Sequence, residues 1–166
     1  MLSTGTRAPD FTLPDSDGQA TTLGDLLARG PLVLYFYPAD FTPGCTREAC
    51  SIRDVHDELR RAGLVVAGIS PQAPASHQRF RERHGLPFTL LADADKAVIR
   101  RYGVEGPLGW GVRRATFLID PDRLVVDSLC ADLRIGRHTA FVQRAIDRSR
   151  ALRGDAAAEL QAPRIP

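Results

Sequence analysis

Two of the three cysteines in this 166-residue chain, Cys45 and Cys50, lie in a short segment with prolines, threonines and a glycine just before Cys45. An odd number of cysteines argues against a structural disulfide framework and favours catalytic, redox or metal-binding roles. Zinc usually takes four ligands in two closely spaced pairs, and no histidine is near this pair, so metal binding fits poorly. The spacing therefore indicates thiol redox chemistry, and we expect no metal or other cofactor.

The residues before Cys45 predict how it is positioned. The apolar run Leu32–Tyr37 is typical of a strand covered on both faces, and Pro38 ends it because proline cannot donate to a sheet. Thr42 is suited to the N-cap of a helix and Pro43 to its first position. Cys45 would then lie in the first turn, where unpaired N–H groups and the helix dipole favour its thiolate, the form that attacks.

A helix end alone does not stabilise a thiolate enough. Lowering the pKa of a cysteine from about 8.5 to about 6 takes about 3.4 kcal/mol, whereas a helix end typically contributes about 0.3 to 1 kcal/mol. A second cation is needed. Arg113 and Arg114 precede the predicted strand Thr116–Ile119, and one of them could lower the thiol pKa and hold a substrate oxygen. The spacing does not say which of the two does so.

The rest of the chain predicts a single α/β domain over residues 1–153. Two short strands around Asp17-Gly18 form an N-terminal hairpin, and one amphipathic helix runs from Cys45 to Ala62. Strands and helices then alternate, which implies parallel strands, before an antiparallel hairpin and a last helix after Gly136. The hairpin strands are Phe11–Leu13 and Thr21–Leu23; the later elements are Leu64–Ser70, Ala75–His84, Phe88–Ala92, Lys96–Tyr102, Thr116–Ile119 and Leu124–Leu129. Residues 154–166 are expected to form a frayed or loosely docked tail.

The composition restricts the partners. A hydrophobic content of 43% is enough for one core, and a net charge of +2 gives no field for a polyanion, which argues against nucleic acid or an anionic membrane. The N-terminus lacks the features of a secretory signal, and no apolar stretch approaches the roughly 18 residues of a membrane span. We therefore expect a soluble, cytoplasmic protein acting on a small, nearly neutral substrate.

Two separated motifs resemble those of a known family. Pro38, Thr42 and Cys45 stand as in the Pro-x-x-x-Thr-x-x-Cys signature of peroxiredoxins, and the stretch from Arg114 to Asp120 resembles the strand that supplies their catalytic arginine. Cys50 is similar to the resolving cysteine of the peroxiredoxin Q subfamily, also called bacterioferritin comigratory protein. The resemblance extends from about residue 5 to about residue 152.

This resemblance implies a thioredoxin-like fold, with a central mixed sheet flanked by helices and an N-terminal β-hairpin. It also implies a peroxidase that reduces hydrogen peroxide and organic hydroperoxides, in which Cys45 thiolate attacks the O–O bond and becomes a sulfenic acid. Pro38 would shield the pocket from water, Thr42 would hydrogen-bond to the peroxide and the thiolate, and Arg114 would polarise both. Glu48 matches a position common in the subfamily, where a link to an arginine would hold the guanidinium.

The resemblance gives Cys50 the role of forming a disulfide with the Cys45 sulfenic acid. In an intact helix, residues five apart are separated by about 7.5 Å along the axis and about 140° around it, whereas a disulfide needs Cα atoms within about 7 Å and facing side chains. The first turns of the helix would have to unwind. By resemblance, a thioredoxin or glutaredoxin-like donor then reduces the disulfide, and the enzyme is a monomer or a homodimer.

Other notable residues are better explained by packing or exposure. Cys130 matches no motif position and is expected to be a packed residue. The four histidines, His56, His77, His84 and His138, have mostly charged neighbours and are expected on the surface. The stretch 106–111 is glycine-rich but lacks the Gly-Lys-Ser/Thr of a phosphate loop, so we expect a surface loop.

Two other functions were weighed. A thiol–disulfide oxidoreductase on the same fold normally uses Cys-x-x-Cys, which this chain lacks. A redox-responsive binding protein would expose a partner surface when the Cys45 helix unwinds. Turnover separates this second alternative from a peroxidase, since a sensor oxidises once and stops, whereas a peroxidase consumes peroxide in proportion to added reductant.

Overall fold

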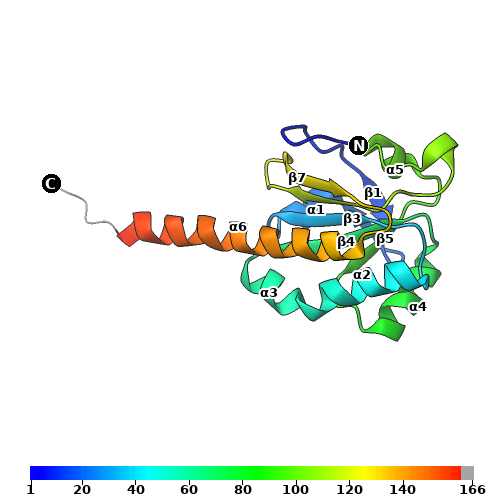
Figure 1. The fold of residues 1–166 in the computed structure, drawn as a ribbon, viewed down its shortest axis with the longest axis horizontal. Coiled ribbons are helices and arrows are strands. Elements are labelled where there is room, and N and C mark those ends of the chain that lie inside the picture. Colours follow the sequence, from blue (N-terminus) through cyan, green and yellow to red (C-terminus); the bar gives the residue numbers. More distant parts are fainter. Residues whose placement is uncertain (162–166) are drawn as a thin grey trace.

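A five-stranded mixed sheet forms the centre of the computed structural model, which describes the backbone of residues 1–161 and the side chains of residues 1–152 (Figure 1). The strands are β3 (Leu32–Phe36), β4 (Val65–Ser70), β5 (Thr89–Ala92), β6 (Ala115–Ile119) and β7 (Val125–Cys130), in the order β5-β4-β3-β6-β7. The strand β4 is parallel to β3 and β5, whereas β6 is antiparallel to β3 and β7. The predicted parallel strands and antiparallel hairpin are both confirmed.

Helices cover both faces of this sheet. One face carries α2 (Pro43–Asp54), α3 (His56–Arg61), α4 (Pro74–His84) and α6 (Ile135–Gln161); the other carries α1 (Leu23–Leu27), α5 (Ala97–Arg101) and the hairpin of β1 (Thr12–Pro14) and β2 (Ala20–Thr22). Successive side chains of β3 enter opposite cores, since Leu34 packs with the α1 and α5 side and Tyr35 with the α2 side. A loop of six residues joins the end of β3 to the start of α2, so the sheet helps to fix where α2 begins.

The helix α1 was missed by the sequence analysis, which extended a strand through Leu23. The strand β2 ends at Thr22, and Thr22 is the N-cap of α1. Its hydroxyl accepts from the backbone N–H of Asp25 at 3.0 Å, and the Asp25 carboxylate accepts from the backbone N–H of Thr22 at 2.9 Å. This reciprocal capping box stabilises a helix start against continuation of the strand.

The single helix predicted from Cys45 to Ala62 is two helices, α2 and α3, with a break at Val55. Asp54 and Val55 are both weak helix formers, the first because its carboxylate competes for backbone donors and the second because it is β-branched. The apolar spacing continues across the break because Ile52 and Leu59 pack in the same core. Periodicity alone therefore could not reveal the interruption.

The last helix, α6, begins at Ile135 and lies beside α2, and Figure 1 shows its C-terminal part extending beyond the sheet. Its apolar side chains Phe141, Val142, Ala145 and Ile146 are buried. Within the described chain, no helix is both long and apolar enough to cross a membrane. The predicted tail, residues 154–166, falls where side chains are not described, and residues 162–166 lie outside the described residues, so the boundary at 153 stays a prediction.

Candidate active site

Cys45 is the third residue of α2 and is almost fully buried, with 2% of its surface exposed. As the sequence predicts, Thr42 is the N-cap and Pro43 the first helical residue. The Thr42 hydroxyl does not bond to a helix N–H group; it donates to the carbonyl oxygen of Ala39 at 3.2 Å. No side chain therefore caps the N–H groups of the first turn, in which Cys45 lies.

The loop between β3 and α2 is held by a buried carboxylate that the sequence analysis did not single out. Asp40 accepts hydrogen bonds from the hydroxyls of Tyr37 and Ser76, each at 2.7 Å, and its Oδ2 lies 2.9 Å from Nδ1 of His77. His77 is fully buried on α4 and its Nε2 faces the carbonyl oxygen of Leu91 at 3.2 Å. The prediction of a surface His77 is wrong, because its polar atoms are satisfied inside the core.

Burial alone would raise the pKa of Asp40, but its hydrogen bonds with His77, Ser76 and Tyr37 outweigh burial and lower it. The adjacent residue, Phe41, has a φ of 60°, in the left-handed region that is unfavourable for a bulky side chain. Its ring is half-exposed and packs edge-on against Phe80, with centroids 5.2 Å apart. The Asp40 cluster on one side and Phe80 on the other therefore hold the turn that leads into Thr42.

We expect Asp40→Asn to lower the free energy of unfolding by about 2 kcal/mol near neutral pH, because charge-assisted buried bonds are lost. A carboxyl whose pKa is lowered by folding stabilises the protein above its unfolded value of 3.8, and this contribution is lost as the pH falls through the folded pKa. Denaturant unfolding at several pH values should therefore show the two proteins converging in acid. Asp17→Asn, which breaks an exposed pair with Arg81, is the control and should change the free energy of unfolding little. A stability difference between wild type and Asp40→Asn that persists unchanged in acid would contradict the role given to the Asp40 carboxylate.

The geometry distinguishes the two candidate arginines. Arg114 is 5% exposed, and its Nη2 donates to Sγ of Cys45 at 3.2 Å. Arg113 has an exposed side chain that lies 3.4 Å from Asp132 instead. Gly44 permits the close approach of Arg114, since a Cβ there would come within 3.2 Å of Nη2.

Glu48 lies one helical turn after Cys45 and holds the same guanidinium. It is fully buried, and Nη1 of Arg114 donates to its Oε2. The backbone N–H of Arg114 also donates to Asp132 at 2.8 Å, which ties the start of β6 to the loop after β7. Burial would lower the pKa of Arg114, but the charge of Glu48 and the bond with Cys45 raise it. Arg114 therefore remains a cation against the Cys45 sulfur.

The two other cysteines occupy different places. Cys50 lies in the same helix as Cys45, is half-buried, and carries a free thiol, as do Cys45 and Cys130. Cys130 ends β7 and packs against the core on the opposite face of the sheet from Cys45. Burial raises the pKa of the Cys130 thiol, which makes it a poor nucleophile. The packing prediction for Cys130 agrees with this position.

His138 is a second histidine wrongly predicted on the surface. It lies in the first turn of α6, is 1% exposed, and faces Glu48 across the space between α6 and α2. Its ring nitrogens contact the Thr116 hydroxyl and the Ala131 carbonyl oxygen. No local pattern in the sequence marks this residue, because all of its partners come from other elements.

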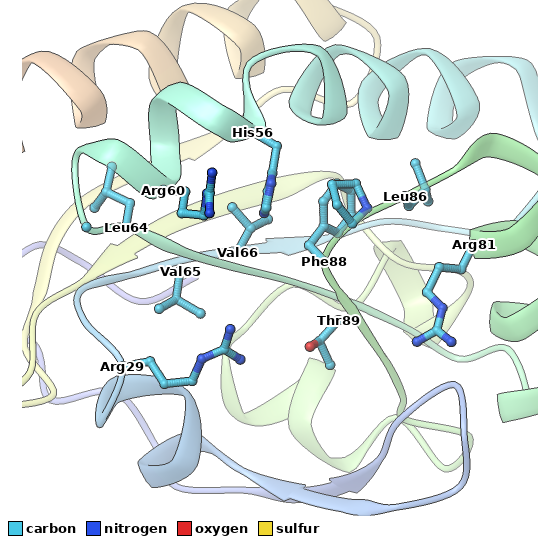
Figure 2. Close-up of a pocket in the computed structure, with 12 residues that line it drawn as sticks. Arg29, His56, Arg60, Leu64, Val65, Val66, Arg81, Leu86, Phe88 and Thr89 are labelled. Atoms are coloured by element: carbon cyan, nitrogen blue, oxygen red, sulfur yellow. The ribbon is translucent and has the colours of Figure 1, made fainter.

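A cavity of about 370 Å³ lies elsewhere, beside the N-terminal ends of β4 and β5 (Figure 2). Arg29 reaches into it from one side and His56 from the other, above an apolar floor that includes Phe88. None of the residues predicted for the site lines it. The loop 106–111 is also separate from the core, with Leu108 and Trp110 largely exposed, as expected of a surface loop.

Comparison with known proteins places this arrangement among thiol enzymes. The family model described as the AhpC/TSA family matches residues 4–128. Peroxiredoxin Bcp of Escherichia coli (strain K12) is 46% identical over 127 residues, covering 73% of this chain and 81% of that protein. The crystal structure of peroxidoxin BcpB from Mycobacterium tuberculosis shares 38% identity with a TM-score of 0.83, covering 91% of this chain and 98% of the other.

A third relative is described by its activity. Structures of a trapped intermediate and ligand complex of the bacterioferritin comigratory protein of Xanthomonas campestris, reported for its alkyl peroxide reduction activity, share 32% identity with a TM-score of 0.75. They cover 83% of this chain and 90% of that one. Together with the mixed sheet, flanking helices and N-terminal hairpin, these matches confirm the predicted thioredoxin-like fold.

Proposed function

Because the chain belongs to the AhpC/TSA family and is a peroxiredoxin, a thiol peroxidase, we propose that Cys45 is its peroxidatic cysteine and Cys50 its resolving cysteine. The observation that carries this proposal is the contact of 3.2 Å between Nη2 of Arg114 and Sγ of Cys45 in the first turn of α2. A cation and a helix N-terminus act there on one buried sulfur. Both favour the thiolate over the thiol.

In the proposed reaction the Cys45 thiolate attacks one oxygen of a hydroperoxide. The S–O bond forms as the O–O bond breaks, so that sulfur is oxidised to a sulfenic acid while the peroxide is reduced to water or an alcohol. The departing oxygen takes up one proton. The fixed guanidinium of Arg114 stabilises the negative charge that passes from sulfur to the leaving oxygen, an effect that is strongest where water is excluded.

Thr42 and Pro38 are proposed to shape the place where the peroxide binds. Thr42 is exposed and its hydroxyl now donates to Ala39; a rotation about χ1 would let it accept from the peroxide instead. Pro38 lies two residues after the end of β3 and is half-buried. It has no N–H group to compete for the peroxide, and its ring would limit the access of water to the thiolate.

Cys50 is proposed to attack the Cys45 sulfenic acid, forming the disulfide and releasing water. Both residues lie in α2, where a separation of five positions places them about 7.5 Å apart along the axis and about 140° apart around it. The first turns of α2 must therefore unwind for each catalytic cycle. The break at Val55 leaves α3 free to stay folded while α2 opens.

The proposed substrates are hydrogen peroxide and organic hydroperoxides, by analogy with the alkyl peroxide reduction activity given for the Xanthomonas protein. A thioredoxin or a glutaredoxin-like dithiol would reduce the disulfide that the unwound α2 presents. The proposed location is the cytoplasm, where the reducing environment would favour the return of Cys45 and Cys50 to free thiols. A monomeric or homodimeric state stays a prediction.

Disulfide mapping tests the proposal. Reduced protein mixed with one equivalent of hydrogen peroxide should yield a Cys45–Cys50 disulfide in peptide mass spectrometry, and added thioredoxin and thioredoxin reductase should sustain peroxide consumption. Cys130→Ser is the matched control and should behave as the wild type. A Cys45–Cys130 bond would remove Cys50 from the mechanism, and oxidation that stops after one turnover would favour a redox-responsive binding protein.

A further inference from the structure

One carboxylate oxygen beside the candidate active site has no hydrogen-bond partner in the described part of the chain. It is Oε1 of Glu48, fully buried, whose other oxygen accepts from Arg114. Nδ1 of His138 lies 3.5 Å from it. An unpaired buried carboxylate oxygen costs several kcal/mol in general. Something must satisfy it when Glu48 is ionised.

The contacts of His138 favour a proton in this role. Its Nε2 lies 3.0 Å from the carbonyl oxygen of Ala131, which can only accept, so Nε2 carries a hydrogen. In the neutral ring Nδ1 is then a bare acceptor, and the Thr116 hydroxyl, 2.8 Å away, can donate to it. That leaves two acceptors, Oε1 and Nδ1, facing each other. Adding one proton to either atom turns the repulsive contact into a favourable one.

Charge balance points to the same conclusion. With Cys45 as a thiolate, the buried groups carry one positive charge, on Arg114, and two negative charges, on the sulfur and on Glu48. One proton on Glu48 or His138 makes this group neutral overall. Once the sulfur is a neutral sulfenic acid, Arg114 and Glu48 balance each other and the proton is no longer needed. Low polarity in the interior makes this balance important.

We propose that Glu48 and His138 share one buried proton that accompanies the Cys45 thiolate, which makes His138 a positioning residue that acts through Glu48 and Arg114. This inference rests on the proposed role of Cys45. The proton balance is closed, because the proton lost by the Cys45 thiol matches the one that the pair gains. When the thiolate attacks, the alkoxide or hydroxide that leaves takes up one proton as the pair gives one up.

The pKa values of the two partners agree with this arrangement. Burial raises the pKa of Glu48 to about 7, although Arg114 opposes the shift. Burial lowers the pKa of His138, although its bond with Ala131 opposes the shift. The two groups therefore approach each other in proton affinity. The other titratable or charged groups near the pair are Arg114, Cys45, Tyr35, Arg137 and Asp132, of which Arg137 and Asp132 are exposed to solvent.

Two substitutions should shift thiolate formation in opposite directions. In a Cys50→Ser, Cys130→Ser background, His138→Asn should slow the oxidation of Cys45 near neutral pH about tenfold, with recovery in alkali, because the asparagine amide satisfies Glu48 without bringing a proton. Glu48→Gln removes the competing negative charge, so the thiolate should persist to lower pH. In the Glu48→Gln background, His138→Asn should shift the pH dependence of Cys45 oxidation no further. His56→Asn is the matched control for loss of a histidine.

Rapid-mixing measurements of Cys45 oxidation across pH, together with the ultraviolet absorbance of the thiolate, give these profiles. If His138 had only a structural role, His138→Asn and Glu48→Gln would shift the pH profile of Cys45 oxidation in the same direction, or would reduce stability without shifting that profile. Either result would overturn the proposal.

A second measurement needs no variant of the pair and no peroxide. Nuclear magnetic resonance of the His138 ring nitrogens should show the pair releasing its proton about one pH unit lower in Cys45→Ser than in the reduced wild type, because the thiolate charge is gone. Identical titrations would exclude the coupling even if peroxide reduction by Cys45 is normal. Failure of the wild type to react with peroxide would instead count against the proposed function.

Discussion

Arg114→Ala is expected to slow the reduction of hydrogen peroxide by about a hundredfold to a thousandfold, the loss typical of removing one fixed donor from an anionic transition state. Nη2 of Arg114 is the cation in contact with the Cys45 sulfur. Its loss removes stabilisation of the thiolate and of the leaving oxygen at once. Single-turnover oxidation of Cys45 at several peroxide concentrations measures the effect, which should lie in the bond-breaking step.

The neighbouring arginine provides the control for this experiment. Arg113→Ala removes the same side chain from a position where it is exposed and near Asp132, and should change the rate little. Arg114→Lys should fall between wild type and alanine, since an ammonium keeps the charge but cannot contact Cys45 and Glu48 with one planar fork. Arg114→Lys also keeps a positive charge beside Glu48, so it can be measured even if Arg114→Ala leaves Glu48 unpaired and the protein unfolds. Equal effects of the alanine changes at 113 and 114 would sink the assignment.

Cys50→Ser is expected to abolish sustained turnover with thioredoxin while leaving the first oxidation of Cys45 intact. The serine hydroxyl cannot form the disulfide, so the sulfenic acid should accumulate and be trapped by a dimedone-type reagent. Further peroxide should then carry Cys45 to the sulfinic acid, which thioredoxin does not reverse. Coupled consumption of the reductant and intact mass after each peroxide addition would follow both events.

Cys130→Ser serves as the matched control, because Cys130 lies on the opposite face of the sheet and its loss should leave turnover unchanged. Sustained turnover in Cys50→Ser would show that another thiol resolves the sulfenic acid. A first oxidation that is slowed as much as the turnover would show instead that Cys50 supports the structure of α2.

Much of the site could be predicted from the sequence because its key signals are local. Pro38, Thr42 and Pro43 set the end of a strand and the start of a helix, and that is enough to place Cys45 in a first turn. The choice between Arg113 and Arg114 was not local. It depends on which of the two side chains before β6 points into the core, and the partner of Arg114, Glu48, lies 66 positions away in the sequence.

The buried polar residues were predicted least well. Asp40 and His77 are 37 positions apart, and each looks like an ordinary polar surface residue until the fold brings them together. The same holds for His138, whose contacts with Thr116 and Glu48 join three elements. Sequence patterns report which residues avoid water, whereas the partner that makes a buried charge tolerable is set by tertiary packing. Likewise, the apolar spacing predicted one helix where Val55 divides two.

The left-handed backbone at Phe41 bears on how often α2 opens. A non-glycine residue in that conformation costs about 1–2 kcal/mol, and this cost is recovered in any state where the turn before Thr42 relaxes. At 1.36 kcal/mol per factor of ten, the open population is roughly ten times larger than an unstrained turn would allow. In the proposed cycle, the residue that fixes the entrance to α2 would thus also shorten the wait between oxidation of Cys45 and its capture by Cys50.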